Sequence, residues 1–362
     1  MAALIKKEKY HMRTQTKNIY VGNVPIGGSN PIAIESMTNT DTCNITATVA
    51  QINELHAAGC EIIRVAIPTA DAALAIKKIK QSISIPLIAD IHFDYKLALL
   101  AVENGADKLR INPGNIGDKN RVREIAEAAN AHGIPIRVGV NGGSLEKEIL
   151  SKNGGITPNG LAESAITHVE MLEKFGFNNI VVSAKASNAP LLIEANKILA
   201  HTLPYPLHIG LTEAGTPYKG AIRSAVGLGV LLNMGIGNTI RVSLSGSPIP
   251  EIEACKEILA TLGLRSFGIT VIACPSCGRT EMPIGDMATE VEQKLSHITK
   301  PITIAVMGCA VNGPGEAKDA DIGVACGKDM AVLFKKGEVV RRLESNEIVN
   351  VLIAEVGQML LD

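Results

Sequence analysis

The segment IIRVAIPTADAALAIKKIKQSISIPLIADIHFDYKLALLAVENGADKLRINPG, residues 62–114, predicts the fold of most of the chain. Three short runs rich in aliphatic residues, 62–68, 86–93 and 108–114, read as strands, and the residues between them recur at helical spacing. Five similar runs lie outside this segment: 32–37, 134–141, 179–185, 206–213 and 239–246. Eight strand–helix repeats over roughly 250 residues predict a (β/α)8 barrel, the TIM-barrel fold.

The alternative to a barrel is a doubly wound open sheet. No expected strand is followed by a full G-x-G-x-x-G turn, which weakens that alternative. The strand–helix rhythm changes near residue 264, and four of the seven cysteines follow it. We therefore expect an α/β protein with a barrel over residues 1–264 and a smaller α/β domain over residues 265–362.

Composition narrows the class of protein. Hydrophobic residues make up 46% of the 362 residues and charged residues 20%, as in a globular α/β protein. Aromatic residues are only 3% and the net charge is −1, so a nucleic-acid-binding surface is not expected. No apolar stretch is long enough for a signal peptide or a membrane span. The odd cysteine count favours free or metal-bound thiols, and we expect a cytoplasmic location with no membrane partner.

One phrase, an arginine between aliphatic residues, recurs in four expected strands and suggests a binding site. Strand side chains alternate between faces, so each arginine shares its face with the residue two further on, which in every case is small or polar. If that face points into the barrel, four guanidinium groups converge near its mouth, where they would suit a phosphate or diphosphate. The alternative is that they face the helices and pair with acidic residues. The four are Arg64, Arg110, Arg137 and Arg241.

Other strand ends carry reactive or polar side chains. Lys185 ends the sixth expected strand and adds a fifth cation at the same level, whereas Glu213 ends the seventh. Asp90 and His92 are two residues apart on the third, and Asn141 ends the fifth. Active-site residues of a (β/α)8 barrel come from these positions, and Glu213 could donate a proton in a dry, closed site.

The cysteines after residue 264 point to a metal site. Cys274 and Cys277 form a CxxC motif, and Cys309 follows in a Gly-rich and Pro-rich segment. Zinc would need a further soft or imidazole ligand, and a redox dithiol would not need Cys309. Three cysteines at such turns suit an iron–sulfur cluster. Spacing leaves the fourth ligand open between Cys326 and Glu316.

These motifs resemble one family over essentially the whole chain, the bacterial 4-hydroxy-3-methylbut-2-enyl diphosphate synthases of the methylerythritol phosphate route to isoprenoids. The resemblance rests on CPSCGR at 274–279, GCAVNGPGE at 308–316, SMTNTDT at 36–42 and LRINPGN at 109–115. It implies a TIM barrel followed by a cluster domain, in the two-domain form that lacks the large insert of plant-type relatives.

The resemblance also implies chemistry and site residues. A 4Fe-4S cluster would be bound by Cys274, Cys277, Cys309 and Glu316, with Glu316 a replaceable ligand. The enzyme would open 2-C-methyl-D-erythritol 2,4-cyclodiphosphate by two one-electron reductions with loss of water, using electrons from flavodoxin or ferredoxin. Glu213 would transfer a proton, and a homodimer would complete each site with the partner's cluster domain. The implied diphosphate ligands and mouth residues are Arg64, Arg110, Arg137, Lys185, Arg241, Asn141, Ser243, Asp90, His92 and Asn112.

Two other functions remain alternatives at this point. One is a zinc-stabilised phosphate-binding barrel protein without redox activity, whose cysteines would be structural. The other is an aldolase-type barrel that uses Lys185 as a Schiff-base amine.

Overall fold

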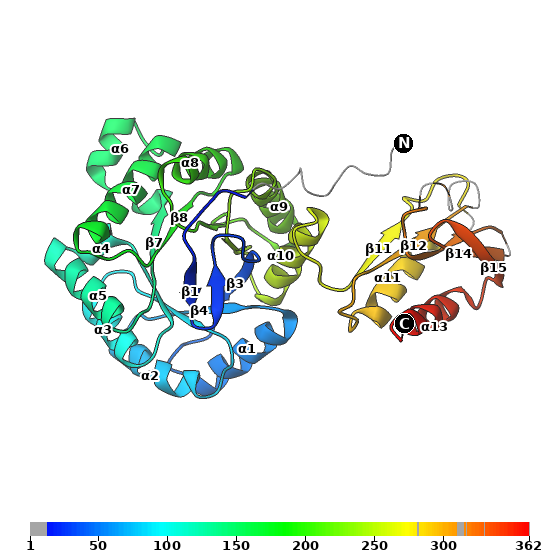
Figure 1. Ribbon diagram of the computed structural model, residues 1–362, viewed down its shortest axis with the longest axis horizontal. Helices are drawn as coiled ribbons and strands as arrows, with labels where there is room; N and C mark the ends of the chain where they lie inside the picture. The colour runs from blue at the N-terminus through cyan, green and yellow to red at the C-terminus, as the bar shows by residue number, and fades with distance from the viewer. Residues whose placement is uncertain (1–12, 281, 310–314, 316, 329, 362) are drawn as a thin grey trace. The chain divides into compact units, whose positions relative to one another are not determined.

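The structure is a computed structural model that describes residues 13–280, 282–309, 315, 317–328 and 330–361. It divides into two compact units between Arg265 and Ser266. The sequence placed the division one residue earlier. Figure 1 shows the helices and strands of each unit.

The first unit is a barrel of eight parallel strands in the order β8-β7-β6-β5-β4-β3-β10-β9, and a single parallel bridge from Val182 to Leu207 joins the two ends. The predicted barrel fold is therefore confirmed. Its strands follow the predicted runs but are shorter. They are β3 (Ala33–Met37), β4 (Ile62–Ala66), β5 (Leu87–Asp90), β6 (Lys108–Ile111), β7 (Ile136–Asn141), β8 (Ile180–Lys185), β9 (His208–Ile209) and β10 (Thr239–Ile240).

Helices surround this ring of strands (Figure 1). Side-chain caps define several of their starts: Asn44, for example, accepts a hydrogen bond from the Ala47 amide, and Gly59 ends the same helix with φ of 110°. The helices are α1 (Ile45–Ala58), α2 (Ala70–Lys80), α3 (Tyr95–Glu103), α4 (Pro113–Ile116), α5 (Lys119–Ala131), α6 (Lys147–Asn153), α7 (Pro158–Lys174), α8 (Ala189–Thr202), α9 (Pro217–Asn233) and α10 (Ile249–Thr261), with a 3-10 turn at Gly142–Ser144.

A short hairpin that the sequence reasoning missed precedes the barrel. Its strands, β1 (Ile19–Val21) and β2 (Val24–Ile26), pair antiparallel. Apolar side chains of the hairpin pack with residues of the barrel strands, among them Ile62, Ile88 and Val181. The hairpin extends the apolar core beyond the strands that carry the charged site.

The second unit is a five-stranded mixed sheet in the order β11-β12-β13-β14-β15. The first three strands are parallel and the last three antiparallel. Apolar residues of the helices pack with those of the sheet into one core. The elements are β11 (Ile269–Ala273), α11 (Ile284–Leu295), β12 (Ile302–Met307), β13 (Ile322–Cys326), β14 (Met330–Lys335), β15 (Glu338–Glu344) and α13 (Ile348–Met359).

No helix among the described residues is both long and apolar enough to cross a membrane.

Candidate functional site

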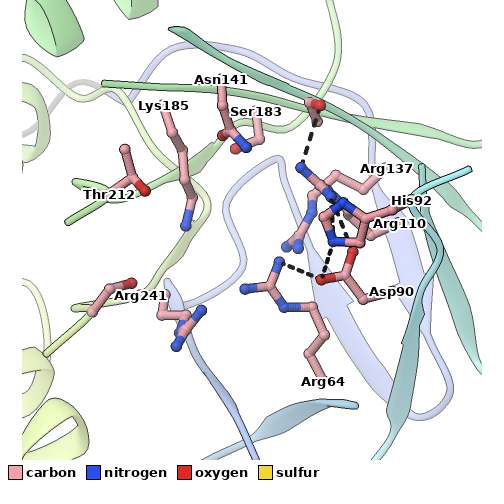
Figure 2. A pocket seen from close by; sticks show the side chains of 12 residues that line it. Arg64, Asp90, His92, Arg110, Arg137, Asn141, Ser183, Lys185, Thr212 and Arg241 are labelled. Atoms are coloured by element: carbon pink, nitrogen blue, oxygen red, sulfur yellow. Dashed lines mark hydrogen bonds and ion pairs between the residues drawn. The ribbon is translucent and has the colours of Figure 1, made fainter. Parts of the chain in front are cut away.

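A cavity of about 150 Å³ lies at the carboxyl ends of the barrel strands. Figure 2 shows that its side chains come from opposite sides of the barrel and point into the same space. All four arginines of the recurring phrase point into it. The lining residues are Arg64, Asp90, His92, Arg110, Arg137, Gly139, Asn141, Ser183, Lys185, Thr212, Arg241 and Ser243.

Asp90 ties together one side of the cavity. Its carboxylate lies 3.1 Å from Arg110 Nη1 and 3.6 Å from Arg64 Nη1, with His92 Nε2 also at 3.6 Å (Figure 2). Burial alone would raise the pKa of Asp90, but Arg64, His92 and Arg110 together hold it well below its usual range. Asp90 is therefore a fixed negative charge that orients two arginines.

Glu35 on β3 balances the charge of the cavity floor. Both of its carboxylate oxygens accept from Arg137 Nη1, at 2.6 and 2.7 Å, and Lys108 Nζ and His208 Nδ1 lie at 3.4 and 3.6 Å. The Glu35 side chain is fully buried. Burial opposes ionisation, but the charges of Arg137, His208, Lys108 and Arg64 outweigh it and keep the pKa of Glu35 well below normal. Arg137 is thus held rigidly from below.

Glu251 on α10 does the same for the last arginine. Its Oε2 accepts from Arg241 Nε at 3.4 Å and from Ser36 Oγ at 3.1 Å, while Oε1 accepts from the Leu244 amide at 2.9 Å. One carboxylate therefore positions Arg241 and the backbone that follows β10.

The cavity keeps an excess of positive charge despite these pairs. Asp90, Glu35 and Glu251 supply three carboxylates against the guanidinium groups of Arg64, Arg110, Arg137 and Arg241, and the amines of Lys108 and Lys185 lie beside them. The Nε atom of Arg64 is buried and has no hydrogen-bond acceptor among the described residues. An unpaired buried donor is costly, so this arrangement favours an anionic ligand with several acceptor oxygens.

Gly139 leaves the space that Arg110 occupies. A Cβ atom at this position would lie 2.5 Å from Arg110 Nε, well inside van der Waals contact. Because Gly139 is on β7 and Arg110 is on β6, the missing side chain lets the guanidinium lie over the neighbouring strand, where its Nη2 is 3.5 Å from the Gly139 carbonyl.

A second hollow of about 490 Å³ adjoins the cavity, and amide and hydroxyl groups line it together with apolar side chains. Glu213 borders it with a backbone φ of 55°, a left-handed conformation that is uncommon for a residue other than glycine. Asn112 accepts from the Gly114 amide at 3.2 Å and donates to Ser144 Oγ at 3.1 Å, which holds the hollow's loops together. Neutral polar groups here suit the hydroxylated part of a ligand.

Most residues that the sequence predicted for the site line the cavity itself. Asn112 and Glu213 line the second hollow instead. Sequence reasoning predicted Asp90 but missed the other two supporting carboxylates, Glu35 and Glu251. Glu35 had a signal, since it is a carboxylate inside an apolar strand run, whereas nothing marked Glu251 within its helix. The other residues missed are Ser183, Thr212, Lys108 and His208.

The predicted cluster ligands lie at one edge of the sheet in the second unit. Cys274 directly follows β11 and Cys309 lies just beyond β12, its parallel neighbour. The Gly308 amide donates to Cys274 Sγ at 3.2 Å, and a Cβ on Gly308 would lie 3.0 Å from that sulfur. Close glycine backbone beside a cysteine sulfur suits a loop that wraps around inorganic sulfide.

Cys277 is exposed on the loop after Cys274. Hydrogen bonds from the Arg279 backbone and side chain lower the pKa of its thiol, which favours the thiolate that binds iron. Within the described residues, no three His, Cys, Asp or Glu side chains come together as a metal-binding group. The identity and the shared sheet edge of the three cysteines nonetheless fit a cluster. Glu316, the implied fourth ligand, lies outside the described residues.

Cys326 ends β13 at the same edge but has a different environment. It is fully buried in the core of the second unit. Burial, and then nearby Cys274, raises the pKa of the Cys326 thiol to about 11. A protonated thiol turned into the core is a poor metal ligand.

These features define a class: a (β/α)8-barrel protein with an arginine-lined cavity at the carboxyl ends of its strands, joined to a unit that carries a three-cysteine motif. Similarity to solved structures supports the barrel. The dihydropteroate synthase of Stenotrophomonas maltophilia aligns over 69% of this chain and 100% of its own, with a TM-score of 0.51 and 14% identity. At that identity the likeness concerns the fold alone.

Sequence comparison identifies the family. The GcpE TIM-barrel domain matches residues 16–256 and the GcpE protein C-terminal domain matches residues 270–358. A protein of Caldanaerobacter subterraneus subsp. tengcongensis is 56% identical over 96% of this chain and 98% of its own length. A protein of Geobacillus kaustophilus is 52% identical over 96% and 93%. Both are named 4-hydroxy-3-methylbut-2-en-1-yl diphosphate synthase (flavodoxin). This chain belongs to the GcpE family, which confirms the resemblance drawn from its motifs.

Proposed function

We propose that this chain is the oxidoreductase that converts 2-C-methyl-D-erythritol 2,4-cyclodiphosphate into 4-hydroxy-3-methylbut-2-enyl diphosphate. The reaction takes up two electrons and two protons, opens the ring and releases one oxygen as water. The observation that carries the proposal is the cavity at the mouth of the barrel, where four arginines and Lys185 converge and three carboxylates pair with the arginines. Near-identical length and more than 50% identity to the named relatives support it.

The strand-end cations would bind the diphosphate. Arg64, Arg110, Arg137 and Arg241 can donate in pairs to phosphate oxygens, because Asp90, Glu35 and Glu251 already fix their orientation. Asn141, Ser243, Asp90 and His92 complete the wall of the cavity. Fixed dipoles and charges of this kind bind an anion with little reorganisation.

The second hollow would hold the carbon skeleton beside the diphosphate. Asn112 borders this hollow, and so does Glu213, which we propose as the proton-transfer residue. Glu213 has a left-handed backbone conformation, which is strained for a residue other than glycine. Strain of this kind is found mainly at functional sites. Glu213 is exposed in the ligand-free barrel, and its carboxyl group would exchange a proton with a departing oxygen once water is excluded from the loaded site.

Cys274, Cys277, Cys309 and Glu316 would hold a 4Fe-4S cluster at the sheet edge of the second unit. When bound, the cluster would supply the electrons for ring opening. An oxygen ligand exchanges more readily than a thiolate, which is the reason to prefer Glu316 over the buried Cys326 as the fourth ligand. Glu316→Ala should make iron binding labile, whereas unchanged iron content would contradict this ligand set.

Electrons would come from flavodoxin or ferredoxin, and flavodoxin appears in the names of the relatives. We propose a cytoplasmic location, because the cytoplasm would keep the three cluster thiols reduced.

We further propose a homodimer in which the partner's cluster unit completes each barrel site. An exposed apolar stripe along α9 supports self-association because isolated chains rarely expose such a row. Its side chains recur every four residues: Tyr218, Ile222, Val226, Val230 and Met234.

Anaerobic reconstitution tests the proposal. The chain is loaded with iron and sulfide, and the cyclodiphosphate is added with a chemical reductant or with reduced flavodoxin. We expect a brown protein and stoichiometric formation of the linear diphosphate, measured by mass spectrometry. A chain loaded with zinc in place of iron serves as the control and should give no product. Failure of the iron-loaded chain to convert the ligand would contradict the proposed function.

A further inference from the structure

Lys185 differs from every other cation of the cavity. Each of the four arginines there has a carboxylate within 3.6 Å. The Lys185 amine has no ion pair or hydrogen bond with any residue in the described part of the chain, although only 8% of the residue is exposed. Figure 2 accordingly shows its amine without a dashed line, on the side of the cavity toward Arg241.

Most of the charges around Lys185 disfavour an ammonium. Burial, followed by the positive charges of Arg64, Arg241 and Arg137, lowers the pKa of Lys185 well below its usual value. Glu35 acts in the opposite direction, but Arg137 and Lys108 already occupy its oxygens.

The carboxylates of Asp90 and Glu251 are already paired with Arg64, Arg110 and Arg241. The remaining titratable neighbours add no negative charge. His208 on β9 lies in the cavity floor, and burial keeps its pKa well below normal, so it is neutral. Cys255 on α10 is a neutral thiol because burial raises its pKa to about 12. Lys185 therefore faces an excess of positive charge from β4, β7 and the end of β10.

A single bridge, from Val182 to Leu207, joins the strand that carries Lys185 to the segment of β9. The amide of Val182 donates to Pro206 O and the amide of Thr212 donates to Ala186 O, one on each side of Lys185 in the chain. Between them, the Ala184 carbonyl accepts from the side chain of Asn196 rather than from β9. A Cβ at Gly210 would lie 3.2 Å from Lys185 Nζ, so the glycine keeps the amine's surroundings free.

We propose that Lys185 is a neutral amine in the ligand-free barrel and takes up one proton when the cyclodiphosphate binds. This inference rests on the proposed function. Two negative charges brought beside the amine would reverse the local field, which turns an unfavourable ammonium into a favourable one. Substrate binding is then coupled to the delivery of a proton into the closed barrel, at the residue next to the reacting ligand.

Calorimetric titration of the cluster-loaded full chain with the cyclodiphosphate, without reductant, tests this coupling. Each phosphorus of this ligand has a single, strongly acidic ionisable oxygen, so the ligand itself does not titrate near neutral pH. Buffers that differ in ionisation enthalpy report protons taken up on binding. We expect about one proton per ligand at mildly alkaline pH, and an affinity that falls about tenfold per pH unit there.

Two variants assign the proton. Lys185→Arg keeps a permanent charge, so it should bind the ligand with no proton uptake and with little pH dependence. Lys185→Met keeps a neutral chain of similar length, so it should bind more weakly and also without uptake. Circular dichroism of both variants checks that the barrel is folded.

The possible outcomes distinguish a failure of the proton coupling from a failure of the proposed function. Wild-type binding without proton uptake would overturn the coupling while leaving the proposed function intact. Uptake that persists in both variants would overturn the role of Lys185 and place the proton on another titratable group of the site, His92, Lys108 or His208. A wild-type chain that does not bind the cyclodiphosphate at all would overturn the proposed function, and this inference with it.

Discussion

The cavity of the barrel and the three-cysteine motif of the second unit differ in how their ligand-binding side chains are held. In the barrel, four arginines are held by three carboxylates before any ligand arrives. In the second unit, Cys274, Cys277 and Cys309 sit on two loops of one sheet edge and form no metal-binding group among the described residues. The strands hold the side chains of the first site in place before a ligand binds. The ligands of the second site would come together only when the cluster binds.

The largest expected effect breaks the second site alone. Cys277→Ser should lower the iron content and abolish turnover, because one iron of the cluster loses its thiolate ligand. Cyclodiphosphate binding in the barrel should persist, since the cavity residues all lie in the first unit. Iron and sulfide analysis, visible absorbance and calorimetry measure the three properties.

Cys326→Ala is the matched control because Cys326 ends a strand at the same sheet edge but is buried in the core. This variant should keep its iron. Loss of iron from Cys326→Ala with retention in Cys277→Ser would reverse the ligand assignment.

The next effect tests preorganisation in the barrel. Glu35→Gln leaves Arg137 buried without its carboxylate, and we expect the free energy of unfolding to fall by about 3–5 kcal/mol. Urea unfolding followed by circular dichroism measures it. Glu194→Gln, which removes an exposed ion pair with Lys197, should change it by less than about 1 kcal/mol.

This prediction has a pH signature. Burial lowers the pKa of Lys108 to about 8 even with Glu35 opposite it. Without Glu35 the pKa falls further, and the unfolded chain then binds more protons than the folded chain at neutral pH. Stability rises with pH wherever that holds, so the deficit of the variant should narrow as the pH approaches 8. A constant deficit across this range would contradict the charge balance assigned to the cavity floor.

A smaller effect is expected from removing one donor to the ligand. Arg110→Ala should weaken cyclodiphosphate binding by about 1.5–3 kcal/mol, the usual contribution of hydrogen bonds to a charged group. Cluster content should not change. Arg121→Ala, outside the cavity and half exposed, is the control and should bind as the wild type does. Equal affinity in the Arg110 variant would show that this arginine does not contact the ligand.

The smallest effect probes how closely the strands fit. Gly139→Ala places a methyl group 2.5 Å from Arg110 Nε, so the guanidinium must shift. We expect affinity to fall by about 1 kcal/mol with the fold intact. Gly229→Ala on α9, where a Cβ meets nothing within 4 Å, should not weaken binding. If both alanine variants bind equally well, the cavity is more adaptable than its packing indicates.

The sequence was informative where the structure is periodic. Alternation along the strands was enough to predict eight barrel strands and to point Arg64, Arg110, Arg137 and Arg241 the same way. The sequence-based alternative assigned acidic partners to outward-facing arginines. In the structure Arg64, Arg110 and Arg137 pair with carboxylates on barrel strands, whereas Arg241 points into the cavity and pairs with Glu251 on the helix α10. Local patterns state which face a residue occupies but not what lies opposite it.

Pairings that depend on barrel closure were out of reach. Glu35 meets Arg137 across 102 positions of the chain, and Glu251 reaches Ser36 across 215. The hairpin of β1 and β2 was missed because strands of three residues give too short an alternation to recognise. The strands β9 and β10 were overestimated because the aliphatic runs continue into loops that extend past the ladder.

The single bridge between Val182 and Leu207 has a consequence for how the barrel opens. Every other pair of neighbouring strands in the barrel is joined by two or more residue pairs, so this junction has the weakest strand pairing of the barrel. Lys185 stands on one side of it, and Arg241 follows the strand that pairs with β9 on the other. A diphosphate bound by Lys185 and Arg241 at once would link the two sides of this junction. Amide hydrogen exchange at Val182 should therefore slow when the ligand binds.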